Sequence, residues 1–325
     1  MRGRDLPNRR SAVAVVSFAL TGLISLGPQA WAATRFMEVP IPTYGSAPWG
    51  IAPGPDGNIW FTEYGGNKIG RITTAGVITE FHLPTAKSDP YGIAAGPDGN
   101  LWFAEWYGNK IGRITPAGAV TGEFTVPTPE SYPIGIAAGP DGNLWFTEYS
   151  GNKIGRITTA GSITEFPITT GYAQLAGITA GPDGNLWFAE SLANEIGRIT
   201  TAGAITEFPI PTAESDPTGI TAGPDGNLWF TEAVGKIGRI TTAGAITGEF
   251  TIPTPHPDDE VIAAGPDGNL WFGEWNKLGR ITTHGAIRES AAKPGVRLSA
   301  ITAGPDGNIW FTEVNRNAIG VCKLR

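Results

Sequence analysis

Short apolar runs separated by turn sequences recur along most of the chain. In residues 92–126 this pattern predicts four strands, named A to D in chain order: 92–95, 100–105, 110–115 and 119–126. Gly-Pro-Asp-Gly separates strands A and B, and Thr-Pro-Ala-Gly separates strands C and D. Both are turn sequences, because proline presets φ at the second turn position and the closing glycine tolerates the left-handed conformation. The segment therefore predicts an antiparallel sheet of four short strands.

Strand B is apolar on both faces, through Leu101, Trp102 and Phe103. A strand with one face in water alternates apolar and polar residues, so a continuous apolar run indicates a strand that is covered on both sides. We expect each sheet to pack between two similar sheets, with the tryptophan and phenylalanine side chains filling the space between them.

The same unit occurs seven times, with Gly-Pro-Asp-Gly-Asn-(Leu/Ile)-Trp-Phe-x-Glu at its centre. The aspartates of this segment are spaced by 42, 43, 42, 42, 42 and 39 residues: Asp56, Asp98, Asp141, Asp183, Asp225, Asp267 and Asp306. A period near 42 is typical of the four-stranded blades of a β-propeller. The chain is therefore predicted to be all-β, a seven-bladed β-propeller with four-stranded blades in a single domain over residues 33–325.

The two ends of the chain complement each other. After the seventh copy the chain provides a strand C at 318–323 but no strand D, whereas residues 34–40, before the first copy, match the strand D of other copies. Pairing of these two segments would remove two exposed sheet edges. We therefore predict that the N-terminal strand completes and closes the last blade.

An antiparallel order A-B-C-D sorts the loops onto two faces. The A–B and C–D turns are nearly identical in all copies and share one face. The B–C loops and the D–A crossovers between blades share the other face and differ from copy to copy. Variable loops on a rigid scaffold are common positions for binding sites. We call this second face the variable face and expect the functional site there.

The first 32 residues have the organisation of a signal peptide. Four arginines within the first ten residues precede an apolar run at 12–26, and an Ala-x-Ala site ends at Ala32. The apolar run is too short to predict a membrane-spanning helix. Cleavage after Ala32 would release a secreted or periplasmic protein.

Charge and cysteine content exclude several classes of partner. The chain has 325 residues, a formal charge of −7 and one cysteine, Cys322. An acidic balance argues against a nucleic-acid groove or an anionic membrane surface as partner. A single cysteine excludes an intramolecular disulfide framework and a cysteine-based zinc site. We expect a monomer that binds neither nucleic acid nor membrane.

Two charged residues recur in the units. Strand B ends in a glutamate in all seven copies, and strand C carries an arginine in six of them. Such repetition favours a structural role, with glutamate and arginine paired or hydrogen-bonded inside each blade. The alternative is a functional ring of carboxylates at the mouth of the central channel.

Aromatic residues concentrate at two positions of the variable face. One position opens strand A, and the other follows the glutamate of strand B. The aromatic residues at these positions are Trp49, Tyr91, Tyr64, Trp106, Tyr149 and Trp275. Exposed rings there could stack on a ring-bearing ligand, or they could cap the packing between blades.

Blade six carries an acidic cluster, His-Pro-Asp-Asp-Glu at 256–260. Four side chains with oxygen or nitrogen donors within five residues could hold a divalent cation. The alternative is a solvated acidic loop. The candidate metal ligands in this cluster are Asp259 and Glu260.

The chain from residue 33 onward resembles the streptogramin B lyase family, also called virginiamycin B lyases. The shared pattern is Trp-Phe-Thr-Glu-x-x-x-Asn-Lys-Ile-Gly-Arg-Ile-Thr-x-x-Gly-x-Ile-Thr-Glu-Phe, found here at 145–166 and, with small variations, at 229–253. For active members, the resemblance implies Mg²⁺-assisted elimination that opens a cyclic depsipeptide antibiotic at an ester linkage. It further implies a histidine as general base and carboxylates as metal ligands.

The family's catalytic positions are substituted in this chain. The resemblance places Ser299 where the family's general-base histidine stands, and Arg297 where a metal-binding glutamate stands. A second family histidine corresponds to Glu260, and a second metal carboxylate corresponds to Glu313 or Val314. A serine without a neighbouring base does not abstract a proton as an imidazole does, and an arginine repels Mg²⁺.

Two functions are consistent with these residues. The first is an exported propeller that lacks the family's lyase reaction and binds a small molecule, cyclic peptide or glycan on the variable face, or acts on another substrate. The alternative is a Mg²⁺-dependent carbon–oxygen lyase that linearises a cyclic depsipeptide antibiotic and so confers resistance. We expect the first.

Overall fold

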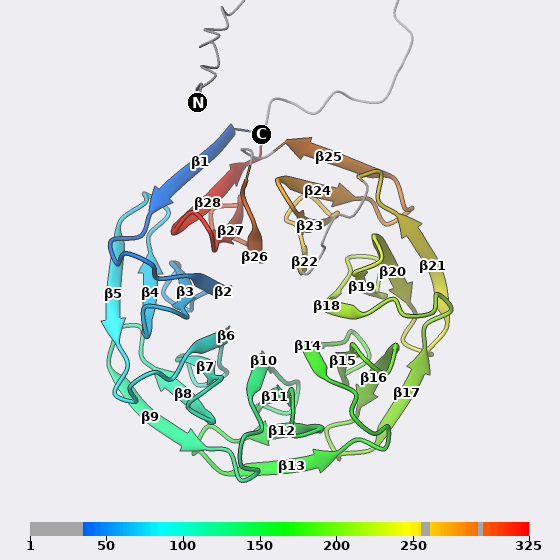
Figure 1. Ribbon diagram of the computed structural model, residues 1–325, viewed down its shortest axis with the longest axis horizontal. Coiled ribbons are helices and arrows are strands. Elements are labelled where there is room, and N and C mark those ends of the chain that lie inside the picture. Colours follow the sequence, from blue (N-terminus) through cyan, green and yellow to red (C-terminus); the bar gives the residue numbers. More distant parts are fainter. Residues whose placement is uncertain (1–34, 255–260, 292–294, 325) are drawn as a thin grey trace, which may run out of the picture. The chain divides into compact units, whose positions relative to one another are not determined.

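Figure 1 shows the computed structural model of the chain, which describes residues 35–254, 261–291 and 295–324. All regular elements among these residues are strands, and they form seven antiparallel sheets of four strands arranged in a ring. The prediction of an all-β, seven-bladed β-propeller with four-stranded blades is confirmed. The described residues contain no helix that is long and apolar enough to cross a membrane.

Each sheet is one blade, and its strands follow the order A, B, C, D from the centre of the ring outward (Figure 1). The A strands of blades one to seven are β2 (Pro48–Pro53), β6 (Pro90–Ala95), β10 (Pro133–Ala138), β14 (Leu175–Ala180), β18 (Pro217–Ala222), β22 (Val261–Ala264) and β26 (Leu298–Ala303). The B strands are β3 (Ile59–Glu63), β7 (Leu101–Glu105), β11 (Leu144–Glu148), β15 (Leu186–Glu190), β19 (Leu228–Glu232), β23 (Leu270–Glu274) and β27 (Ile309–Glu313).

The two outer strands of each blade follow in the same order. The C strands are β4 (Lys68–Ile72), β8 (Lys110–Ile114), β12 (Lys153–Ile157), β16 (Glu195–Ile199), β20 (Lys236–Ile240), β24 (Lys277–Ile281) and β28 (Ala318–Lys323). The D strands are β5 (Ile78–His82), β9 (Val120–Thr125), β13 (Ile163–Pro167), β17 (Ile205–Pro209), β21 (Ile246–Thr251), β25 (Ile287–Ala291) and, in blade seven, β1 (Arg35–Pro40).

The strands predicted in residues 92–126 are present with bounds shifted by one or two residues. The largest shift is at β6, which begins at Pro90. Pairing of β6 with β7 continues past a register irregularity between Pro90 and Ile93, which a regular alternation does not predict.

The N-terminal strand closes the ring, as predicted. All six residues of β1 pair antiparallel with β28, from Arg35 opposite Lys323 to Pro40 opposite Ala318. Blade seven is thus built from both ends of the repeat array. Closure removes the free edges that an open array of sheets would expose.

The B strands form the buried layer between blades. In blade one, Trp60 is fully buried and packs against Leu101 and Phe103 of blade two. The Trp60 indole Nε1 donates a hydrogen bond of 3.0 Å to Asp56 Oδ1 in the A–B turn. The same bond forms in all seven blades, so the turn supplies the acceptor that each buried indole needs.

The predicted pairing of the repeated glutamate with the repeated arginine is wrong. In blade one, strand register places Glu63 opposite Lys68, and Arg71 opposite Trp60 at the other end of the hairpin. The Arg71 guanidinium lies 5.6 Å from the Trp60 ring centroid and donates to the carbonyl of Pro116 in blade two at 2.8 Å. The arginine therefore has a structural role, but it stacks on aromatic rings and links neighbouring blades.

Candidate functional site

The A strands surround a cavity of about 520 Å³ at the centre of the ring. Its lining also includes Tyr149, Gln174 and Ser191, which lie in loops of the variable face. The cavity is therefore reached from the face on which the sequence predicted a binding site.

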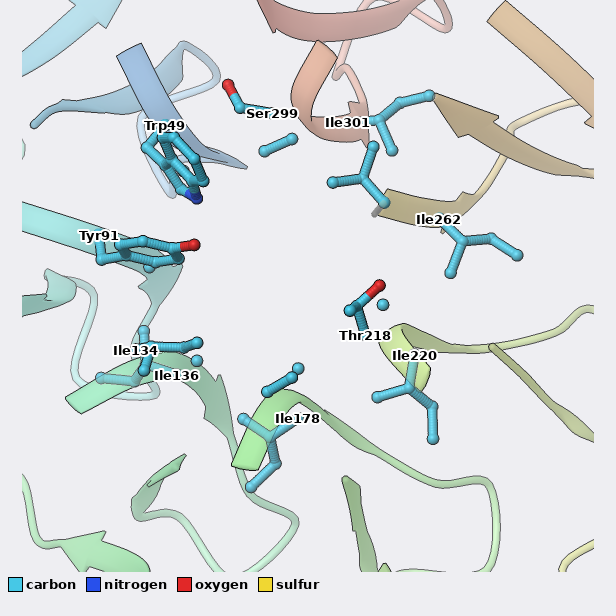
Figure 2. A pocket seen from close by; sticks show the side chains of 18 of the residues that line it. Trp49, Tyr91, Ile134, Ile136, Ile178, Thr218, Ile220, Ile262, Ser299 and Ile301 are labelled. Atoms are coloured by element: carbon cyan, nitrogen blue, oxygen red, sulfur yellow. The ribbon is translucent and has the colours of Figure 1, made fainter. Parts of the chain in front are cut away.

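Two layers of A-strand side chains line this cavity. One layer holds an isoleucine from every blade, each 7–8% exposed: Ile51, Ile93, Ile136, Ile178, Ile220, Ile262 and Ile301. The other layer lies two residues earlier in each strand and differs between blades: Trp49, Tyr91, Ile134, Ala176, Thr218 and Ser299, several of which are labelled in Figure 2. Because the isoleucine layer is uniform, selectivity must come from the variable layer and the loops above it.

A chain of ring contacts runs across blades one to three. The Trp49 and Tyr91 rings are 4.9 Å apart between centroids, Tyr91 stacks on Trp106 at 5.5 Å, and Trp106 contacts Tyr149 at 5.2 Å. Tyr64 lies 6.2 Å from Trp49. We call these five residues the aromatic arc; all are half-buried. Five of the six aromatic residues singled out from the sequence are thus brought together.

Among the lining residues that the structure describes, the wall opposite the arc has no aromatic ring. That wall holds small and hydroxyl-bearing residues, including Ala176 and Thr218, beside side chains of the isoleucine layer. Figure 2 shows Trp49 and Tyr91 on one side of the cavity and Thr218 on the other. The cavity is therefore asymmetric, with one stacking wall.

A third position of the repeat also faces the cavity, and it was not predicted from the repeat pattern; only its residue in blade seven was named, through the family resemblance. It lies two residues before the variable A-strand residue and places Gln174, Asp216 and Arg297 in the lining. In blade three it is Tyr132, whose ring lies 5.4 Å from that of Trp106. The sequence does contain a signal for this position. Its residue differs between copies, and it always lies two residues before the variable residue of strand A.

Few of the described residues that line the cavity are charged. Among the described lining residues, Asp216 has the one carboxylate and Arg297 the one cationic group. The Arg297 guanidinium lies 5.6 Å from the centroid of the Trp49 ring, a cation–π contact at the end of the arc. Burial, together with the Asp89 carboxylate, raises the pKa of Tyr64, so its hydroxyl stays neutral at physiological pH.

Two candidates from the family positions lie in blade seven. Ser299 lines the cavity, is 4% exposed, and donates a hydrogen bond of 2.8 Å to the Pro48 carbonyl. Glu313 ends β27, is 3% exposed and is not part of the cavity lining. The backbone carbonyl of Arg297 accepts a hydrogen bond from the Val314 amide at 3.2 Å. The side chains of these candidates therefore do not converge on one point of the cavity.

The remaining candidates are not placed at the arc. Trp275 is 43% exposed, lies outside the cavity lining, and has no ring contact among the described residues. Asp259 and Glu260 lie outside the described residues. Neither described histidine, His82 or His284, lines the cavity.

Comparisons with known proteins identify similar chains. A family model described as "Virginiamycin B lyase family" matches residues 30–123 and 107–294. A streptogramin B lyase structure is 39% identical and covers 92% of this chain and 100% of its own, with a TM-score of 0.87. Virginiamycin B lyase from Staphylococcus aureus is 43% identical and covers 90% of this chain and 100% of its own, with a TM-score of 0.85. A catalytically inactive form of that lyase with quinupristin matches equally well. A comparison with curated proteins returned no significant match.

Proposed function

Since the chain belongs to the virginiamycin B lyase family, we propose that it is an exported propeller that binds a cyclic peptide on its aromatic arc without opening the ring. The observation that carries this proposal is a run of ring contacts beside the central cavity. Trp49, Tyr91 and Tyr149 line the cavity, and Trp106, which is outside the lining, contacts both Tyr91 and Tyr149. Half-buried rings that already pack on one another present their free faces with little loss of conformational freedom on binding.

The chemistry of the cavity supports binding over elimination. A general base must hold a lone pair within hydrogen-bond reach of the substrate proton and have a pKa near the working pH. Ser299 is nearly buried and its hydroxyl is already a donor to the Pro48 carbonyl. No described histidine lines the cavity to activate it. We therefore assign Ser299 a structural role.

The Mg²⁺ ion that the family resemblance implies does not fit the described residues. Where the resemblance requires a carboxylate, this chain has Arg297, whose guanidinium lies over Trp49 at the cavity. A fixed positive charge there opposes a divalent cation. Glu313 is buried and is not part of the cavity lining.

The alternative is that the chain is a lyase whose catalytic groups differ from those of its family. The observation in its favour is the 43% identity with virginiamycin B lyase over 90% of the chain. Under this alternative, Asp216 is the described carboxylate that lines the cavity and could act as a base. The two functions differ in whether the ligand leaves the cavity unchanged.

Cellular location and oligomeric state are part of the proposal. The arginines, apolar run and Ala-x-Ala site at the N-terminus support export with cleavage after Ala32. Pairing of β1 with β28 covers the edge that β28 would otherwise present to a second copy, which supports a monomer.

Titration with quinupristin tests the proposal, because a relative of this chain is known with that compound. We expect saturable quenching of tryptophan fluorescence and recovery of the intact cyclic compound after incubation with and without Mg²⁺. Elimination leaves the mass of the compound unchanged, so the product is examined by chromatography with fragment analysis. A linear product would establish the lyase alternative, and the absence of saturable binding would contradict the cyclic-peptide proposal.

Matched variants locate the site. Trp106→Ala removes the ring that contacts both Tyr91 and Tyr149, and we expect at least about tenfold weaker binding, or ~1.4 kcal/mol. Trp275→Ala removes an equally large ring outside the arc and should leave the affinity unchanged. Equal losses in both variants would contradict a site on the arc.

A further inference from the structure

Five blades hold a lysine between two glutamates near the variable-face ends of strands B, C and D. The lysine opens strand C and lies opposite the glutamate that ends strand B. Its ammonium lies within 4.0 Å of a D-strand glutamate in each case: Lys68–Glu80 at 3.1 Å, Lys110–Glu123 at 3.5 Å, Lys153–Glu165 at 2.8 Å, Lys236–Glu249 at 3.9 Å and Lys277–Glu289 at 2.8 Å. One positive charge therefore offsets two carboxylates in these blades.

Blade four replaces this lysine with Glu195. In the strand register, Glu195 lies directly opposite Glu190, where like charges destabilise a sheet. One carboxylate oxygen from each of Glu190, Glu195 and Glu207 lies within 4.8 Å of the other two. Blade four thus gathers three acidic groups where its neighbours gather two acids and a base.

Glu190 points into this cluster without a partner. It is 0% exposed, and neither of its carboxylate oxygens has a hydrogen-bond partner. In the part of the chain that the structure describes, no basic nitrogen lies within 4.0 Å of the carboxylates of Glu190, Glu195 or Glu207. A buried carboxylate in such surroundings must either bind a proton or gain a cation.

The crossover that leads into blade four holds the other two carboxylates in place. Thr169 Oγ1 donates to Glu207 at 2.7 Å, and Thr170 Oγ1 donates to Glu195 at 3.3 Å. The Thr170 amide also donates to Glu207 at 3.3 Å. These bonds orient a donor set made entirely of oxygen, which is the preference of hard divalent cations.

We propose that blade four binds one hard divalent cation of the Ca²⁺ class through Glu190, Glu195 and Glu207, where five other blades hold a lysine ammonium. The ion would join strands β15, β16 and β17. In five other blades, the positive charge of the C-strand lysine attracts the glutamates of strands B and D in the same way. Ca²⁺ suits the site because it accepts irregular geometry and completes its coordination with water. None of the three glutamates lines the central cavity, so the proposal is independent of the proposed function.

A shared proton is the competing way to remove charge from the cluster. Burial, together with the carboxylates of Glu207 and Glu195, raises the pKa of Glu190 to about 8. The test is therefore made above that pH, where a proton competes least with a cation.

Calorimetric titration of the chelator-treated full chain with CaCl₂ tests the site. We expect one Ca²⁺ bound per chain and a higher Tm with Ca²⁺ than without it. Glu195→Lys restores the pattern of the other blades and should abolish this binding, while raising the Tm of the cation-free protein. Absence of Ca²⁺ binding by the native chain, or equal stoichiometry in Glu195→Lys, would overturn the proposal.

A variant that gains a site is also needed, because Glu195→Lys could lose Ca²⁺ binding through misfolding alone. Lys153→Glu gives blade three the same set of three glutamates, and we expect it to bind a second Ca²⁺. If the Tm of the native chain changes on acidification but not on addition of Ca²⁺, the cluster binds a proton and not a cation. That result would overturn the proposal. The quinupristin titration should be the same in all these variants, so failure here is distinguishable from failure of the proposed function.

Discussion

The hydroxyl of Ser299 donates a hydrogen bond of 2.8 Å to the carbonyl oxygen of Pro48, a residue 251 positions earlier in the chain. The bond joins the A strands of blades seven and one at the wall of the cavity. The same hydroxyl lies 2.9 Å from Thr312 Oγ1. A serine held by two neighbours in this way stabilises the closure of the ring.

Replacement of Ser299 should affect stability more than ligand binding. We expect Ser299→Ala to lower the free energy of unfolding by about 1 kcal/mol, because the Pro48 carbonyl loses its donor. Quinupristin affinity should change less than about twofold, since the aromatic arc is intact. Urea unfolding and fluorescence titration measure the two effects. The exposed Ser150→Ala is the control, and a large loss of quinupristin affinity specific to Ser299→Ala would contradict the structural role.

Asn317 should be essential for closure of the ring. Its Oδ1 accepts hydrogen bonds from the backbone and hydroxyl of buried Ser46, and its Nδ2 donates to the carbonyls of Ile41 and Thr43. We expect Asn317→Ala to lower the free energy of unfolding by about 2–3 kcal/mol. Denaturant titration provides the measurement.

Asn317→Gly separates two contributions at this position. Asn317 has φ of 55°, in the left-handed region that alanine disfavours and glycine accepts. The glycine variant loses the same hydrogen bonds, so it should be more stable than the alanine variant by about 1 kcal/mol. Native stability in either variant would show that the four bonds do not hold blade seven to blade one.

The glycine at the centre of strand C should not tolerate a methyl group. A Cβ on Gly155 would lie 2.0 Å from Cζ of the buried Phe146 ring, which occupies the space above the glycine. We expect Gly155→Ala to cost about 2–3 kcal/mol in unfolding free energy, because the ring cannot move in a packed interior. Gly171→Ala is the matched control. A Cβ there meets nothing within 4 Å, and its effect should stay within about 0.5 kcal/mol. Similar Tm values for the two variants would contradict this account.

Stability should fall as pH rises from 4.5 to 8. Burial raises the pKa of six glutamates that end B strands from 4.5 to about 8 or about 7: Glu63, Glu105, Glu148, Glu190, Glu232 and Glu274. The folded state therefore binds protons that the unfolded state releases. The contribution is fully present below pH 4.5 and is lost as pH rises through the folded-state values. Tm measured across this range provides the check.

Glu148→Gln isolates one of these groups. Glutamine has the shape of the protonated acid and does not titrate, so the variant should lose less stability than the native chain on raising the pH to 8. Glu165→Gln is the opposite control. Although burial opposes it, hydrogen bonds from Lys153 and Thr128 lower the pKa of Glu165, so this substitution should destabilise the protein near neutral pH. Parallel stability profiles for Glu148→Gln and the native chain would contradict the raised pKa.

The position of Arg71 shows that a correctly identified repeat does not by itself give the correct cross-strand partners. Pairing of the repeated arginine with the repeated glutamate was predicted because both occur in six of the seven units. The B–C loop of blade one spans residues 64–67, which makes Lys68 the partner of Glu63 and leaves Arg71 opposite Trp60. Loop length sets hairpin register, and a difference in register changes every cross-strand partner.

The candidate site was predictable in part. The variable position of strand A placed Trp49 and Tyr91 at the channel because each copy of the repeat enters the ring in the same way. Tyr132 was not predicted as a member of the site, and Arg297 was placed there only by the family resemblance, since their contacts with Trp106 and Trp49 cross from one blade to another. Their positions depend on the rotation between neighbouring blades, which a single repeat does not contain.

The amino-acid sequence by itself determined the number of blades, the closure of the last blade by residues 34–40, and the face that carries the variable loops. These features follow from a local pattern repeated at a constant period, so each copy specifies the same strands and turns. Only the tertiary structure decided which side chains meet: Trp49 with Tyr91 and Arg297, and Glu190 with Glu195 and Glu207. The physical reason is that these contacts join different strands or blades, where distance is set by register and packing and not by separation along the chain.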